Sequence, residues 1–151
     1  MRGIDCSIVV DAGPARVFAA FFDPKALQEW WEVRRSVTTP RMLGVFALEW
    51  ETADMSDPVL GPLGGVLYGT VIDVRPSQSF FVADVYWNPP DGDPIGPMAL
   101  DVTLTLSGAS TVVRYQQKGC DDSPRWHRYY AVVEPGIAAS LGRLKAYVEA
   151  A

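Results

Sequence analysis

Histidine and cysteine are scarce in this sequence, which has one histidine and two cysteines among 151 residues. The cysteines, Cys6 and Cys120, form neither a CxxC pair nor a spacing typical of metal ligands, and no second histidine could complete a metal site. No metal or other cofactor is therefore expected. Both thiols are expected to be reduced, as in a cytosolic protein; the alternative is that the strands carrying them pair and the two thiols meet.

An excess of basic residues is also missing. The 13 Lys and Arg residues are outnumbered by 18 Asp and Glu residues, giving a formal net charge of -5 at pH 7 and a pI near 4.7. This balance argues against nucleic acid as a partner, because binding to phosphates needs a basic patch. No apolar run approaches the ~20 residues of a membrane span, and residues 1–5 lack the apolar run of a signal peptide. A cytoplasmic location is the expected default.

The length and composition are those of an ordinary soluble domain. With 48% hydrophobic and 21% charged residues, a chain of 151 residues can bury a substantial core. One domain covering residues 1–151 is therefore predicted.

The longest predicted element is a helix from Pro124 to Ala150. A proline suits the first helical turn, where a missing N–H costs nothing. Pro135 lies inside the helix and clashes with the carbonyl four residues back, so a kink is expected between Ala131 and Pro135. Apolar residues at spacings of three and four form one stripe along this helix: Trp126, Tyr130, Val133, Ile137, Leu141, Leu144 and Val148.

Upstream of this helix, the patterns predict strands and two short helices. A first strand at residues 4–10 precedes helices that begin at Pro14 and Pro24, the second capped by Asp23. Further strands are predicted at residues 33–37, 45–51, 66–74, 80–87, 98–106 and 111–118, with a loop at 52–65. The clearest alternation places one face of a strand toward a core: Met98, Leu100, Val102, Leu104 and Leu106.

The predicted fold class is α+β. A curved antiparallel sheet of about seven strands is expected to wrap on the long C-terminal helix, because the sheet must cover its apolar face and this helix is the only element long enough to do so.

This order of elements resembles the helix-grip fold of the START-like, or polyketide-cyclase-like, superfamily. Closer marks are the segments Val10-Asp11-Ala12-Gly13-Pro14 before Val17-Phe18, Asp23-Pro24 before Trp30-Trp31, Gly44 to Phe46, Gly69-Thr70-Val71 with Val74 and Pro76, and Gly136 before Leu141, Leu144 and Lys145. These marks resemble the activator-of-Hsp-ninety-ATPase homologue family of that superfamily, and together they cover nearly the whole chain. The resemblance implies one START-like helix-grip domain with a cavity between sheet and helix, which in that family often takes an apolar small molecule.

Three residues depart from the family pattern. Gln117 stands where the family often has a histidine, Ile137 where it usually has a tryptophan, and Pro135 is unusual inside the long helix. Each departure alters the cavity wall or the path of the helix, so the identity of a ligand does not carry over from the family.

Three residues are weak candidates for catalysis: Asp84, Tyr115 and His127. His127 lies one position off the helix stripe and is interpreted as an exposed or capping residue near the helix start. Asp84 interrupts an otherwise apolar strand; alternation places it toward solvent with Phe81 and Ala83 facing the core, whereas the family pattern implies the opposite phase. A β-bulge would decide between the two.

The function expected first is non-catalytic binding of an apolar, lipid-like or aromatic molecule between sheet and helix. An interaction module that docks on a chaperone or another protein, with the acidic segment 51–65 as the contact, and a cyclase- or hydrolase-like enzyme are the alternatives. The oligomeric state is left open, a homodimer included. The residues expected to line the cavity are Phe46, Leu48, Trp50, Leu100, Val102, Leu104, Val113, Tyr115, Gln117, Trp126, Tyr130 and Val133.

Overall fold

The computed structural model describes residues 3–119 and 121–150. Its main feature is an antiparallel sheet of seven strands in the order β1–β9–β8–β7–β6–β3–β2, so that the first and last strands of the chain lie side by side. This confirms the predicted fold class. The strands are β1 (Gly3–Val10), β2 (Arg35–Thr38), β3 (Val45–Trp50), β6 (Gly65–Arg75), β7 (Ser79–Asn88), β8 (Ile95–Ser107) and β9 (Ser110–Lys118).

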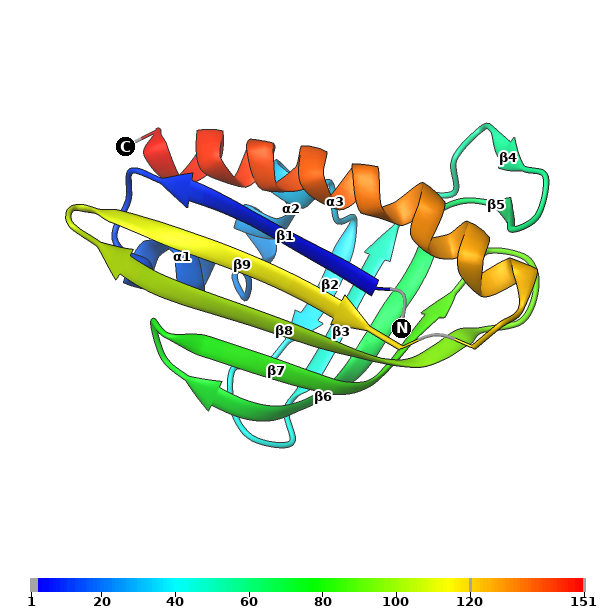
Figure 1. The fold of residues 1–151 in the computed structure, drawn as a ribbon, viewed down its shortest axis with the longest axis horizontal. Coiled ribbons are helices and arrows are strands. Elements are labelled where there is room, and N and C mark those ends of the chain that lie inside the picture. The colour runs from blue at the N-terminus through cyan, green and yellow to red at the C-terminus, as the bar shows by residue number, and fades with distance from the viewer. Residues whose placement is uncertain (1–2, 120, 151) are drawn as a thin grey trace.

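Within the described residues, three helices complete the fold, together with a small hairpin of β4 (Ser56–Asp57) and β5 (Gly61–Pro62) inside the segment predicted to be a loop. Helices α1 (Pro14–Ala20) and α2 (Pro24–Trp31) follow β1, and α3 (Pro124–Glu149) ends the described chain. Figure 1 shows the sheet curving around one side of α3. In the same view α2 lies near the C-terminal half of α3, and the β4–β5 hairpin lies near its N-terminal half.

Helix α3 begins as the sequence predicts. The side chain of Ser123 caps it by accepting a hydrogen bond from the backbone N–H of Trp126 at 3.2 Å, and Pro124 occupies the first turn. The helix continues through Pro135, and its axis changes direction along its length in Figure 1. The side chains that it buries are Tyr129, Tyr130, Ile137, Ser140, Leu141, Leu144 and Val148.

A β-bulge in β7 decides the orientation of Asp84. Val82 pairs with Leu100 and Val85 with Met98, so β7 has one residue more than β8 in this interval, and Asp84 adopts a φ of 51° there. The extra residue shifts the alternation by one position, which buries Phe80 and Val82 before the bulge and Val85 and Trp87 after it. The predicted burial of Phe81 and Ala83 was therefore wrong, while Asp84 is exposed as alternation predicted.

The prediction for the end of β8 was also wrong. Leu106 was predicted to share the buried face of β8, but its side chain is 62% exposed near the turn into β9.

Cys6 is a half-buried free thiol opposite Tyr115 in the β1–β9 pairing, and burial raises the pKa of this thiol. Cys120 lies outside the described residues. Within residues 3–119 and 121–150, no helix is long and apolar enough to cross a membrane.

Candidate functional site

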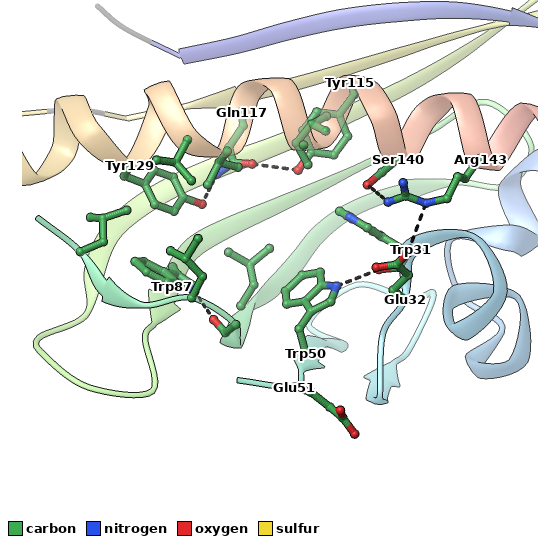
Figure 2. A pocket seen from close by; sticks show the side chains of 18 residues that line it. Trp31, Glu32, Trp50, Glu51, Trp87, Tyr115, Gln117, Tyr129, Ser140 and Arg143 are labelled. Carbon is green, nitrogen blue, oxygen red and sulfur yellow. Dashed lines mark hydrogen bonds and ion pairs between the residues drawn. The ribbon is translucent and has the colours of Figure 1, made fainter. Parts of the chain in front are cut away.

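A pocket of about 350 Å³ lies between the inner face of the sheet, the end of α2, the segment from Glu51 to Gly64 and one face of α3. Figure 2 shows the 18 residues that line it. They are Trp31, Glu32, Trp50, Glu51, Leu60, Leu63, Gly64, Leu67, Trp87, Tyr115, Gln117, Tyr129, Val132, Val133, Gly136, Ile137, Ser140 and Arg143.

One stripe of α3 forms the roof of this pocket, and Gly136 lies in the middle of it. A Cβ built on Gly136 would meet nothing within 4 Å. Because the neighbouring helical positions on both sides face the pocket, the missing side chain of Gly136 leaves part of the space that the pocket occupies. The stripe recurs at spacings of three and four: Tyr129, Val132, Val133, Gly136, Ile137, Ser140 and Arg143.

Tryptophan rings supply much of the apolar wall. The indole N–H of Trp50 donates to the carbonyl of Trp31 at 2.8 Å, and that of Trp87 donates to the carbonyl of Gly64 at 2.7 Å. Ring centroids lie 5.7 Å apart for Trp31 and Trp50, and 5.4 Å apart for Trp87 and Tyr129. Since both indole donors are satisfied by backbone, Trp50 and Trp87 offer a ligand mainly apolar surface.

A chain of hydrogen bonds crosses the buried part of the pocket (Figure 2). The hydroxyl of Tyr115 donates to Oε1 of Gln117 at 2.8 Å, and Nε2 of Gln117 donates to the hydroxyl oxygen of Tyr129 at 2.8 Å. All three side chains are at most 3% exposed. Burial raises the pKa of both tyrosines, so both hydroxyls stay protonated at neutral pH.

Charged groups are confined to the mouth of the pocket. Arg143 is held in place by two hydrogen bonds, from Nε to the carbonyl of Trp30 at 3.1 Å and from Nη2 to Oγ of Ser140 at 3.0 Å. Its Nε also lies 3.9 Å from the carboxylate of Glu32. Glu51, the other exposed carboxylate of the mouth, lies 3.9 Å from Nε of Arg34. A ligand would therefore meet charge at its outer end and a largely apolar wall further in.

The segment 51–65 is fixed against α3 by Asp57. Nε and Nη2 of Arg128 donate to Oδ1 of Asp57 at 2.8 and 2.6 Å, while the backbone N–H groups of Val59 and Leu60 donate to Oδ2 at 3.0 and 2.9 Å. These bonds, that of Arg128 first, lower the pKa of Asp57 to about 2. Asp57 is thus engaged within the protein rather than presented to a partner, and the segment places Leu60 and Leu63 on the pocket wall.

Four of the twelve residues predicted to line a ligand cavity lie on the wall of this pocket: Trp50, Tyr115, Gln117 and Val133. The other eight do not line it. Near Phe46 the inner face of the sheet is covered by the turn that follows α1, because the ring of Phe22 lies 5.9 Å from Phe46 and 4.8 Å from Phe80. Trp126 is half-buried, and the remaining seven are buried outside the pocket: Phe46, Leu48, Leu100, Val102, Leu104, Val113 and Tyr130.

Most residues of the roof were not predicted from the sequence. The predicted stripe on α3 follows the core-facing positions, whereas Tyr129, Gly136 and Ser140 lie on the adjacent part of the same face. The sequence does contain a sign of these positions, because Tyr129 stands beside Tyr130 and a glycine interrupts the apolar pattern of the helix. Only the packing of the sheet, however, shows which side of α3 faces the pocket.

The three weak catalytic candidates are not brought together. Tyr115 lines the pocket, whereas Asp84 and His127 are exposed and are not among its lining residues. Over the described part of the chain, no group of three or more His, Cys, Asp and Glu side chains is arranged to hold a metal ion.

The sheet that grips a long C-terminal helix, with a pocket between them, defines the helix-grip class of the START-like superfamily. Within it, the model of the "Activator of Hsp90 ATPase homolog 1-like protein" family matches residues 11–149, and the chain belongs to this family. Among curated proteins, none matches the sequence.

Solved structures share the fold at low sequence identity. A protein from Mesorhizobium loti is 22% identical, with a TM-score of 0.72 over 96% of this chain and 95% of that one. A protein from Mycobacterium smegmatis is 16% identical, with a TM-score of 0.74 over 98% and 91%. The Aha1 dimer from Colwellia psychrerythraea is 16% identical, with a TM-score of 0.68 over 99% and 98%. At these identities the similarity shows the fold alone.

Proposed function

We propose that this protein binds one apolar small molecule of aromatic or lipid-like character in the pocket between the sheet and α3, without catalysing a reaction on it. The observation that carries the proposal is the pocket wall itself. It combines about 350 Å³ of space with tryptophan faces whose indole N–H groups are already bonded to backbone carbonyls. A space of this size with few polar groups is typical of ligand sites held together mainly by buried apolar area.

Two residues of α3 support the proposal through their small size. Gly136 contributes no side chain, and Ile137 stands where the family usually has a tryptophan. Both leave room beside the sheet that a larger side chain would occupy.

The proposal is tested by filling the pocket from the roof. Gly136 lines the pocket, so the new side chain of Gly136→Leu is expected to enter it, whereas Gly142 does not line the pocket; a Cβ at either position meets nothing within 4 Å. Leucine is favoured over glycine within a helix by up to about 1 kcal/mol, so neither variant is expected to unfold. The probe is N-phenyl-1-naphthylamine, a neutral dye whose emission rises in apolar surroundings.

We expect the wild type and Gly142→Leu to bind the dye at one molecule per chain, and Gly136→Leu to lose that binding while its circular dichroism is unchanged. Equal binding by both variants would place the dye elsewhere and refute the proposal. If the wild type binds no dye, the better candidate is protein docking on the outer face of the sheet. There the rings of Tyr68 and Tyr86 stack 5.9 Å apart, and Val37 of edge strand β2 is 58% exposed.

A further inference from the structure

The hydrogen bonds in the buried part of the pocket leave one donor without an acceptor. Gln117 uses its Oε1 to accept from Tyr115 and its Nε2 to donate both to Tyr129, at 2.8 Å, and to the sulfur of Met98, at 3.3 Å. The hydroxyl of Tyr129 accepts in this chain, and no described residue accepts its hydrogen. Its hydroxyl group lies at the pocket in Figure 2.

The direction of this chain follows from Met98. A thioether sulfur can only accept a hydrogen bond, so the Gln117 atom beside it is the amide nitrogen rather than the oxygen. The oxygen then faces Tyr115, which must be the donor, and the nitrogen faces Tyr129, which must be the acceptor. The hydroxyl hydrogen of Tyr129 is consequently turned away from Gln117.

The other polar groups of the described pocket wall do not accept a hydrogen bond from the Tyr129 hydroxyl. The indole N–H groups of Trp50 and Trp87 are donors themselves, and backbone carbonyls already accept from them. The carboxylates of Glu32 and Glu51 lie at the exposed mouth, whereas Tyr129 is 3% exposed. A buried donor without an acceptor destabilises the state that contains it, so a ligand that supplies an acceptor gains affinity.

We propose that the ligand of this pocket carries a hydrogen-bond acceptor of the carbonyl type at its buried end, where it accepts a hydrogen bond from the hydroxyl of Tyr129. This inference rests on the proposed function and adds the chemical class of the ligand to it. Because burial keeps Tyr129 protonated, the donor is available throughout the neutral pH range. A pure hydrocarbon of the same shape leaves this buried hydroxyl without an acceptor and gains no affinity from it.

The experiment uses two probes of nearly identical shape: 2-acetylnaphthalene, which has a ketone oxygen, and 2-isopropenylnaphthalene, which has a CH2 group in its place. Their affinities are measured by displacement of N-phenyl-1-naphthylamine from the wild type, from Tyr129→Phe and from Tyr147→Phe. Tyr147 lies on the same helix and does not line the pocket, so it controls for the loss of a tyrosine hydroxyl. The infrared band of the bound ketone is recorded as a second measurement.

We expect the ratio of ketone affinity to hydrocarbon affinity to be about twofold to tenfold higher in the wild type and in Tyr147→Phe than in Tyr129→Phe, which is the range of one net hydrogen bond. The carbonyl band should lie at lower frequency in the wild type than in hexane and should return toward the hexane position in Tyr129→Phe. A ratio of the two affinities that is the same in the wild type and in Tyr129→Phe, or a carbonyl band that keeps its position in Tyr129→Phe, overturns this inference and leaves the proposed function standing. If neither naphthalene binds, this inference and the proposed function both fail.

Discussion

At the scale of single residues, Asp57 links the stability of the protein to pH. Its Oδ1 accepts two hydrogen bonds from Arg128 of α3 and its Oδ2 accepts two from backbone N–H groups, and its side chain is 4% exposed. Its pKa falls from 3.8 to about 2 in the folded protein, because these donors favour the charged carboxylate. A carboxylate with a lowered pKa stabilises the fold at pH values above its unfolded pKa, and this contribution is lost as the pH falls through the folded pKa.

We therefore predict that part of the unfolding free energy is lost between about pH 4 and pH 2, and that Asp57→Asn removes this part of the pH dependence. The variant should be less stable than the wild type at pH 7, since the amide replaces the ion pair with Arg128. Asp54→Asn, which alters an exposed carboxyl of the same segment, is the control. Urea titrations across this pH range are the measurement. Parallel curves for the wild type and Asp57→Asn would contradict the role given to Asp57.

At the scale of elements, α3 is held to the sheet by its buried stripe. Leu141 is 2% exposed, and replacing it with alanine removes buried methyl groups and leaves a cavity, so Leu141→Ala should cost about 2–5 kcal/mol of unfolding free energy. Leu106→Ala makes the same chemical change at a side chain that is 62% exposed and should alter stability by about 0.5 kcal/mol or less. Denaturant titration compares the two. Similar losses in both variants would mean that this face of α3 does not pack on the core.

The elements were predictable because each depends on a local pattern. The alternation of β3 and the spacing on α3 follow from period 2 and period 3.6, and Pro14, Pro24 and Pro124 mark where helices begin. The bulge at Asp84 was not predictable, since one extra residue in β7 is defined only by its pairing with β8. Alternation alone consequently assigned Phe81 to the wrong face.

The pocket was only partly predictable, because its wall also depends on how distant elements pack together. Sequence patterns distinguish buried from exposed faces, but they do not show which buried residues touch a void. Phe46 and Trp50 share a face of β3, yet Phe46 is covered by Phe22 whereas Trp50 lines the pocket. The outcome depends on where α1 and α2 come to rest on the sheet, which no residue of β3 specifies by itself.

At the scale of the whole molecule, the pocket is closed by three segments that are far apart in the sequence. Helix α2 contributes Trp31, the segment 51–65 contributes Leu60 and Leu63, and α3 supplies the roof. Figure 1 shows α2 and the β4–β5 hairpin at opposite halves of α3, with the curved sheet between them. The fold therefore leaves the pocket under the middle of α3, where Gly136 lies.

The most direct test of binding in this pocket is a nitrogen-15 NMR titration of the five tryptophan indole N–H signals with 2-acetylnaphthalene. Trp50 and Trp87 line the pocket, whereas Trp126 on the same helix as the roof does not. We predict large, saturable shifts of the Trp50 and Trp87 signals at one ligand per chain, with the Trp126 signal nearly unchanged. Shifts confined to Trp126 or to backbone signals of the outer face around Tyr68, with the Trp50 and Trp87 signals unmoved, would contradict binding in this pocket.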